Sequence, residues 1–336
     1  MSSKGAGKTE PRQALRVGVV GAGVMGSNHA RVLAGLPGVD LVGVVDPLPA
    51  HRTRVTELAN CTTFASLDEL LSEGVDAVTV AAPTHLHHEI ALACIARNIH
   101  VLVEKPIASS VEEGREIVTA AQRAGVTLMI GHVERFNPAV AAIKRAIAGE
   151  DILSIAITRV GPFPPRMSNV GVVIDLAVHD IDLIRWFTES DIIEVQPQLS
   201  SAVAEREDIA LLQFRTASGV LAHINTNWLT PFKARNVTVA TRGKYITGDL
   251  LTRQVTECFG FKPDGSYSMR HLPVGHDEPL RAELLAFLYA VRTGTSPAVT
   301  GDEGVASLAI ATQCLETSSH RIAAPMAHKG PRRVAG

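Results

Sequence analysis

Near its N-terminus the chain runs Leu15-Arg16-Val17-Gly18-Val19-Val20-Gly21-Ala22-Gly23-Val24-Met25-Gly26. An apolar run of strand length leads directly into Gly-x-Gly-x-x-Gly, and a segment with helical spacing follows. In this setting Gly21 permits a tight turn, Gly23 lets the backbone approach a pyrophosphate, and Gly26 lets the helix pack closely on the strand. The first turn of the helix offers free N–H groups to the phosphates. The stretch therefore predicts a strand–turn–helix unit that binds a dinucleotide.

The second predicted strand, residues 41–45, ends in Asp46, which lies 20 residues beyond Gly26. A carboxylate at this place hydrogen-bonds the 2′-hydroxyl of a ribose and repels a 2′-phosphate, so the sequence favours NAD over NADP. Arg52 and Arg54 follow nearby and keep NADP as the less favoured alternative.

The pattern of apolar runs divides the chain into two predicted domains. Between residues 14 and 135, short β-rich runs alternate with helical segments, which is typical of a parallel sheet covered on both faces, a Rossmann domain. From 136 to 323 one helix is followed by a series of strand-like runs, which predicts an α+β domain with a mainly antiparallel sheet. Residues 1–13 and 324–336 lack hydrophobic periodicity and are expected to be flexible tails.

Composition excludes several classes of function. The 336 residues carry a net charge of −2 and only 4% aromatic residues, so neither bulk charge nor base stacking favours nucleic acid. No apolar run is long enough to cross a bilayer. The four cysteines are far apart in sequence, as expected for reduced thiols in a cytoplasmic protein.

Two further clusters are candidates for chemistry. Glu104-Lys105-Pro106 follows the predicted strand 101–103, and ligands of parallel sheets bind outside the carboxyl ends of the strands. In a helix predicted for 172–187, Asp175 and His179 are four residues apart and share one face among apolar neighbours. Buried polar groups need partners, and a cleft that contains a lysine would supply one. An internal capping network is the alternative.

Together, Gly21–Gly26, Ala82-Pro83-Thr84-His85, Glu104-Lys105-Pro106 and Asp175-x-x-x-His179 resemble motifs of the glucose–fructose oxidoreductase, inositol dehydrogenase and rhizopine-catabolism (Gfo/Idh/MocA) family. The resemblance implies a Rossmann domain followed by a domain whose open sheet packs against another subunit, in a homodimer or homotetramer. It also implies a catalytic set of Lys105, Asp175 and His179. The NAD contacts that it implies are Gly21, Gly23, Val24, Met25, Gly26, Asp46, Ala82, Pro83, Thr84, His85, Glu104 and Lys105.

Two longer stretches, 131–138 and 175–186, more narrowly resemble the UDP-N-acetylglucosamine 3-dehydrogenase branch. This implies oxidation of a secondary hydroxyl, C3 of the sugar, to a 3-keto nucleotide sugar. Many family members have Gly-Gly before the Asp helix, whereas this chain has Gly171-Val172, a change that bears on the sugar bound. The candidate substrate contacts are Arg135, Asn137, Arg159, Arg166, Lys233 and Arg235. Four of these are cations beside two Pro-containing segments, where they could pair with a diphosphate: Arg159, Arg166, Lys233 and Arg235.

Alternatives remain open on these residues. An imidazole such as His179 suits acceptance of the hydroxyl proton, and Lys105 suits stabilisation of charge on oxygen, but the sequence leaves open which is the base. The substrate could instead be inositol or a free monosaccharide, and a non-catalytic NAD-sensing regulator is a candidate of another class. His85 and His88 share a helix face, but no nearby cysteine or carboxylate completes a metal site, so no metal is predicted.

Overall fold

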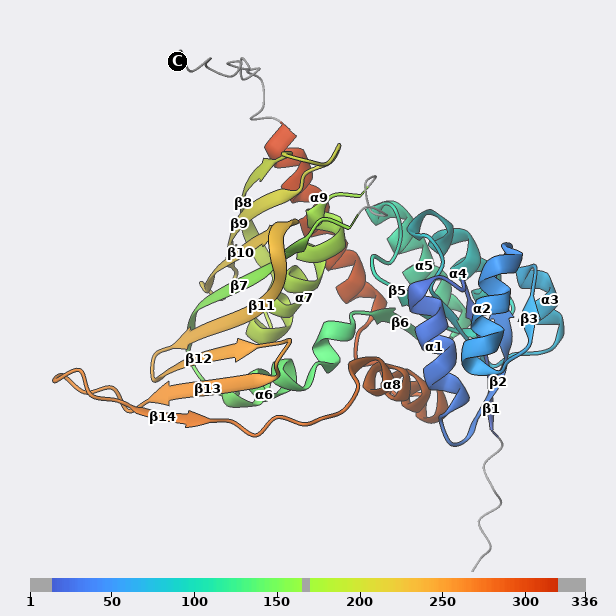
Figure 1. Ribbon diagram of the computed structural model, residues 1–336, viewed down its shortest axis with the longest axis horizontal. Helices are drawn as coiled ribbons and strands as arrows, with labels where there is room; N and C mark the ends of the chain where they lie inside the picture. The colour runs from blue at the N-terminus through green and yellow to red at the C-terminus, as the bar shows by residue number, and fades with distance from the viewer. Residues whose placement is uncertain (1–13, 165–169, 320–336) are drawn as a thin grey trace, which may run out of the picture. The chain divides into compact units, whose positions relative to one another are not determined.

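The computed structural model describes residues 14–164 and 170–319 (Figure 1). These residues form two compact units: a first unit of residues 14–137 and 276–306, and a second unit of residues 138–275 and 307–319. The predicted tails lie outside the described residues. The first boundary lies two residues beyond the predicted one, and residues 276–306 belong to the first unit and not to a continuous second domain. Glu278, just before helix α8 (Pro279–Thr293), pairs with Arg31 of helix α1 (Val24–Ala34) and helps to hold this segment in the first unit.

The first unit contains a six-stranded parallel sheet in the order β3-β2-β1-β4-β5-β6, which confirms the predicted Rossmann architecture. The strand order reverses between β1 and β4, and ligands bind at such a switch point, outside the carboxyl ends of the strands. The strands are β1 (Leu15–Val20), β2 (Val39–Val45), β3 (Thr63–Phe64), β4 (Ala77–Val80), β5 (His100–Glu104) and β6 (Leu128–Gly131).

Helices follow most of these strands, and local capping signals mark where several of them begin. Helix α5 starts at a capping box, in which the Ser110 hydroxyl accepts the Glu113 N–H at 3.1 Å and the Glu113 carboxylate accepts the Ser109 N–H at 3.1 Å. Besides α1 and α8, the helices are α2 (Pro49–Ala59), α3 (Leu67–Ser72), α4 (His87–Ile95), α5 (Val111–Ala124), and the 3₁₀ turns η1 (Thr84–Leu86) and η2 (Val133–Phe136).

The second unit contains an eight-stranded sheet in the order β14-β13-β12-β11-β7-β10-β9-β8. Its pairs are antiparallel except β7–β10, so the predicted mainly antiparallel sheet is confirmed. The strands are β7 (Ile152–Pro162), β8 (Ile192–Ser200), β9 (Ile209–Thr216), β10 (Leu221–Asn227), β11 (Leu229–Thr241), β12 (Lys244–Asp249), β13 (Gln254–Phe259) and β14 (Ser268–His271). The helical segments are α6 (Pro138–Ala146), η4 (Val173–Ala177) and α7 (Val178–Thr188), and α9 (Gly301–Ser319) continues into this unit.

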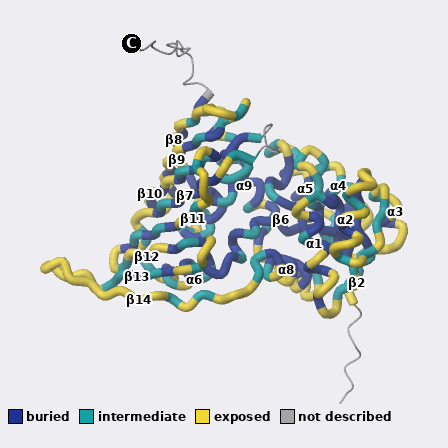
Figure 2. Tube along the Cα trace, viewed as in Figure 1, coloured by how far each residue is buried: buried dark blue, intermediate teal, exposed yellow. Residues whose placement is uncertain are grey.

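One face of the second sheet is buried and the other is open to solvent. Along β9 the residues Ala210, Leu212 and Phe214 are buried, while the alternate residues are exposed. The buried residues join a hydrophobic cluster with apolar side chains of α6 and α7, which lie against this sheet in Figure 1. In Figure 2 the segment that contains β14 is largely exposed, and every residue of β14 itself is exposed. No described helix is both long enough and apolar enough to span a membrane.

Candidate functional site

The glycine turn after β1 has the geometry that a dinucleotide needs. Gly21 has φ +97°, and a methyl group built there would lie 2.6 Å from the Ala81 carbonyl oxygen. At Gly26 the added carbon would be 1.7 Å from the Gly21 carbonyl oxygen, so only glycine fits. At Gly23, by contrast, it would meet no described atom within 4 Å. The backbone at Gly23 is therefore open on the side where a pyrophosphate can approach the start of α1.

Asp46 is held rigidly at the end of β2. Its carboxylate accepts the N–H groups of Ala22 at 2.8 Å and Leu48 at 2.9 Å, and it contacts the His51 ring nitrogen Nδ1 at 3.1 Å. Burial acts to raise the pKa of Asp46, but these hydrogen bonds outweigh burial and hold the pKa below its usual value. The group at the predicted ribose position is therefore an anion at neutral pH.

Two arginines of α2 fold back toward the same place. The Arg54 guanidinium donates to the Ala22 carbonyl oxygen at 2.9 Å, and that of Arg52 donates to the Asp46 carbonyl oxygen at 2.7 Å. The cations that kept NADP as an alternative thus bind backbone oxygens around the turn, and they partly offset the negative charge of Asp46.

His87 is a site residue that sequence reasoning missed as a functional group. Its ring is buried, with Nε2 at 2.9 Å from the Ala82 carbonyl oxygen and Nδ1 at 2.9 Å from that of Pro106. One imidazole therefore links the loop after β4 to the loop after β5, the two loops that carry the predicted cofactor contacts. Burial lowers the pKa of His87. The only indication of His87 in the sequence is its position, three residues after Thr84 of the predicted cofactor-binding motif.

The Glu104-Lys105-Pro106 segment lies where the sequence predicted, at the carboxyl end of β5. Glu104 is buried and contacts Nε2 of His29 at 2.8 Å. Lys105 follows it and is half-buried, and the Lys105–Pro106 peptide bond is cis.

The segment with Asp175 and His179 is not the regular helix that the spacing predicts. Residues 173–177 form the π-helical turn η4, in which the Val178 N–H donates to the Val173 carbonyl oxygen, and α7 begins only after it. The prediction of one α-helix from 172 is therefore wrong in its first turn. Asp175 lies within this wider turn and His179 just after it, and both are half-buried. Such π turns occur often at functional sites.

Glu207 anchors this turn. Its carbonyl oxygen accepts the Val172 N–H at 2.9 Å, and its carboxyl group accepts the Val173 N–H at 3.3 Å. A methyl group on Gly171 would lie 1.8 Å from the Glu207 carboxyl, so a larger residue there would displace this side chain from the turn. Burial raises the pKa of Glu207.

Several residues expected to contact substrate have partners inside their own unit. Arg159 is 2% exposed, and its Nε and a terminal nitrogen bind the Asp180 carboxylate at 2.7–3.0 Å. Arg135 is buried and pairs with Glu303 at 2.7 Å. These ion pairs weigh against a role for either arginine in binding a diphosphate, because each cation is already neutralised by a carboxylate.

The other candidates divide between the units. Asn137 is buried in the first unit, with its side-chain nitrogen 3.5 Å from the Glu134 carboxylate. In the second unit, Arg235 is the register partner of Arg159, so both point to the same face of the sheet, and Lys233 is exposed. Arg166 lies outside the described residues.

Comparison with known proteins is consistent with this geometry. Residues 15–132 match the family model of the Gfo/Idh/MocA oxidoreductases with an NAD-binding Rossmann fold, and residues 153–246 match the model of their C-terminal domain. The chain belongs to the Gfo/Idh/MocA family. It is therefore an NAD(P)-dependent oxidoreductase that acts on CH–OH groups.

Individual relatives of this Gfo/Idh/MocA oxidoreductase have different substrates in their names, among them a nucleotide sugar, inositol and 1,5-anhydro-D-fructose. It is 30% identical to a UDP-N-acetylglucosamine 3-dehydrogenase of Acidithiobacillus ferrooxidans, over 70% of this chain and 74% of that protein. It is 32% identical to an inositol 2-dehydrogenase of Rubrobacter xylanophilus, over 93% of this chain and 92% of that one. A solved structure of the Acidithiobacillus enzyme superposes with a TM-score of 0.85, at 27% identity, over 91% of this chain and 99% of the other.

Proposed function

We propose that this oxidoreductase oxidises C3 of UDP-N-acetylglucosamine to the 3-keto nucleotide sugar, with NAD as the hydride acceptor. The observation that carries the proposal is the likeness to the Acidithiobacillus enzyme, which extends over 99% of that chain at a TM-score of 0.85. Inositol is the second candidate substrate, because the Rubrobacter inositol dehydrogenase matches over 92% of its length at slightly higher identity.

The residues of the first unit fit NAD. The open backbone at Gly23 suits the pyrophosphate, and the ionised carboxylate of Asp46 suits the two hydroxyls of an unphosphorylated ribose. A 2′-phosphate would meet the negative charge of Asp46, which supports NAD over NADP. Arg52 and Arg54 bind backbone oxygens, and this lessens their value as phosphate ligands.

Bound NAD⁺ supplies a hydride acceptor, and the chain must manage the proton and the charge. In our proposal Lys105 and His179 hold the reacting hydroxyl, one accepting its proton and the other stabilising the oxygen as negative charge develops there. Asp175 orients the imidazole or binds a neighbouring hydroxyl. The carboxyl end of β5 and the start of α7 are thus assigned the reacting groups.

The test is reduction of NAD⁺, followed by absorbance, with UDP-N-acetylglucosamine, UDP, myo-inositol and glucose supplied separately. We expect turnover with the nucleotide sugar alone, and a slower rate with NADP⁺. UDP without the sugar is the matched control for diphosphate binding. If myo-inositol is turned over and the nucleotide sugar is not, the substrate assignment is contradicted and the second candidate is favoured.

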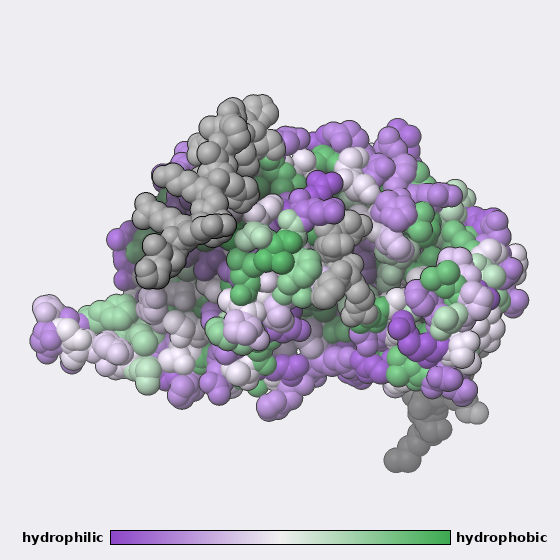
Figure 3. Space-filling view, turned by 45° about the horizontal axis from the view of Figure 1, so that its top comes forward, coloured by the Kyte–Doolittle hydropathy of each residue, from purple (hydrophilic) through white to green (hydrophobic). Residues whose placement is uncertain are grey.

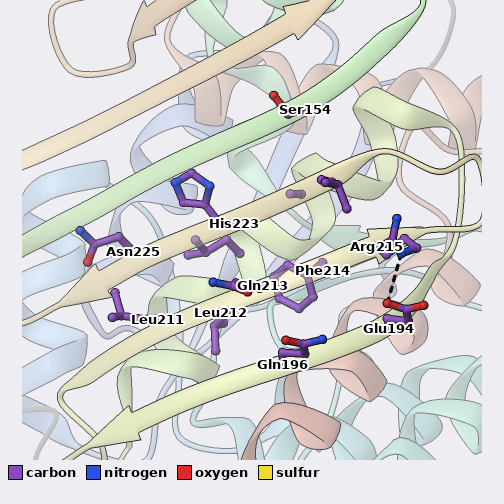
Figure 4. A pocket seen from close by; sticks show the side chains of 13 residues that line it. Ser154, Glu194, Gln196, Leu211, Leu212, Gln213, Phe214, Arg215, His223 and Asn225 are labelled. Atoms are coloured by element: carbon purple, nitrogen blue, oxygen red, sulfur yellow. Dashed lines mark hydrogen bonds and ion pairs between the residues drawn. The ribbon is translucent and has the colours of Figure 1, made fainter.

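We also propose that the open face of the second sheet joins two copies of the chain. This face has a hollow of about 590 Å³, and Figure 4 shows it lined by side chains of β7, β8, β9 and β10. Leu211 and Leu221 are 46% and 50% exposed there, between polar residues such as His223 and Asn225. Figure 3 shows the molecule from a direction turned by 45° from that of Figure 1, with hydrophilic residues over much of the visible surface and hydrophobic patches among them. The two exposed leucines of the hollow, which a second copy of the chain would bury, support the proposal.

A further inference from the structure

A cluster of three ionisable side chains is buried in the first unit, beneath the Glu104-Lys105 segment. His29 comes from α1, Glu104 from the end of β5, and Glu283 from the middle of α8. One nitrogen or oxygen atom of each lies within 4.8 Å of the others. His29 and Glu283 are 0% exposed and Glu104 is 7% exposed.

The two carboxyl groups of this cluster have different surroundings. Glu104 contacts His29 Nε2 at 2.8 Å, the distance of a normal N–H···O hydrogen bond. Neither carboxyl oxygen of Glu283 has a hydrogen-bond partner among the described residues. An ionised carboxylate in that position would be desolvated and would face a second negative charge. Burial, and then the charge of Glu104, raise the pKa of Glu283 well above its usual value.

Either a proton or a metal cation could remove the excess negative charge, and the distances favour the proton. Two ligands of one tetrahedral zinc ion, each bound at about 2.0–2.1 Å, are separated by about 3.3–3.4 Å. His29 Nε2 and Glu104 Oε1 are closer than that, at 2.8 Å, and are already joined by a hydrogen bond. A cation would have to break this contact, whereas a proton on Glu283 leaves it intact.

Other charged groups on the elements that pack against α8 have partners elsewhere. On α1, Arg31 pairs with Glu278. On η2, Arg135 pairs with Glu303, and the Glu134 carboxylate contacts the Asn137 amide. Glu104 is therefore the charged neighbour that acts on Glu283.

We propose that Glu283 is a positioning residue that carries a proton at neutral pH. In this neutral form it lets Glu104, the residue before Lys105, keep its hydrogen bond to His29. An ionised Glu283 would repel the Glu104 carboxylate and displace the segment that carries the lysine. The role assigned to Lys105 rests on the proposed function, but the protonation of Glu283 does not.

The dependence of the Tm on pH tests whether Glu283 is protonated in the native state. Below the usual glutamate pKa both the native and the unfolded chain hold this proton. Above it the unfolded chain releases the proton and the native chain keeps it, so the native state loses stability as pH rises toward the raised pKa. Glu283→Gln removes this effect. We expect the Tm of the variant, relative to the original chain, to rise by about 3–5 °C per pH unit from about pH 5 upward. Glu278→Gln, in the same unit, is the matched control and should show no such trend.

Infrared spectroscopy at neutral pH gives a second readout that needs no substrate. We expect the C=O stretch of a protonated carboxylic acid, lost in Glu283→Gln and retained in Glu278→Gln. A flat Tm difference together with no such band would overturn the protonation. Elemental analysis tests the alternative that a metal cation binds this cluster. One equivalent of a divalent metal in the purified chain, lost in Glu283→Gln, would show a cation site instead of a protonated glutamate.

Kinetics test the positioning role. Glu283→Gln, which keeps the shape of the neutral acid, should retain kcat and the KM for NAD⁺ within about threefold. Glu283→Ala removes the charge but leaves a cavity beside Glu104, so the segment before Lys105 can shift; kcat should fall more than about tenfold, with the KM for NAD⁺ within about threefold and the chain folded. Full activity in the alanine variant would refute positioning. If no sugar or polyol is turned over, the proposed function fails. The Tm and infrared results still show whether Glu283 is protonated at neutral pH.

Discussion

Removing one partner of the buried ion pair between Arg159 and Asp180 should cost far more stability than removing one partner of an exposed ion pair in the same unit. The two side chains are 3% and 0% exposed, and the Arg159 Nε and terminal nitrogen bind the carboxylate at 2.7–3.0 Å. Removing one partner of a buried pair costs about 3–5 kcal/mol, because the other charge stays desolvated. For a unit of this size, that corresponds to a fall in Tm of about 6–20 °C for Asp180→Ala.

The chain has a matched control for this prediction in the same unit. Arg242 pairs with Asp151 at 2.8 Å, with side chains 76% and 59% exposed, and both lie outside the hollow of the proposed interface. Water screens such a pair, so Asp151→Ala should cost less than about 1 kcal/mol. Differential scanning calorimetry of both variants measures the contrast.

Replacing both buried partners separates lost packing from an uncompensated charge. Arg159→Met combined with Asp180→Leu should recover most of the stability that Asp180→Ala loses, because apolar side chains of similar size can replace a buried pair. If Asp180→Ala lowers Tm no more than Asp151→Ala does, the large cost assigned to breaking the buried pair is refuted.

Three further predictions address the cofactor, the chemistry and the assembly. Lys105→Ala should leave NAD⁺ binding near normal in calorimetry but reduce turnover by about 10²–10⁴, the usual contribution of a positioned proton-transfer group; unchanged turnover would exclude Lys105 from the mechanism. Asp46→Ser should raise the ratio of kcat/KM for NADP⁺ to that for NAD⁺ at least about tenfold, because it removes the anion that opposes a 2′-phosphate. Equal loss with both cofactors would mean that Asp46 only supports the turn. Leu211→Glu should shift the sedimenting species from oligomer to monomer, whereas Leu58→Glu, at a site 48% exposed in the first unit, should not. A monomeric original chain would refute the proposed interface.

The parts of the fold that the sequence predicted well are those with local signals. The glycine turn is specified in part by short-range sterics, since an added methyl on Gly26 would collide with the carbonyl oxygen of Gly21 in the same turn. Asp46 is likewise fixed by N–H groups of Ala22 and Leu48, which the strand–turn–helix motif itself brings near. The sequence motif predicts the structure of this region correctly because these interactions join residues of the motif itself.

What the sequence did not predict depends on partners that are distant along the chain. Periodicity indicates that α8 has an apolar face, but not which core receives it, and so residues 276–306 were assigned to the wrong unit. The π turn depends on Glu207, which holds the N–H groups of Val172 and Val173 from more than 30 residues away. Arg159 looked like a substrate ligand because its partner, Asp180, lies on another element.

The same distant partners indicate how the chain supports its candidate catalytic residues. These contacts involve residues close to the proposed catalytic groups: Asp180 follows His179, Glu104 precedes Lys105, and Gly171 lies two residues before the turn that carries Asp175. A catalytic side chain must be held within about 0.5 Å of its productive position, which exposed contacts seldom achieve. Rigid contacts made by the neighbouring residue can hold the backbone while leaving the reacting side chain able to meet substrate. On this view substrate preference can change through exposed residues such as Lys233, whereas changes at Asp180, Glu104 or Gly171 should impair every substrate alike.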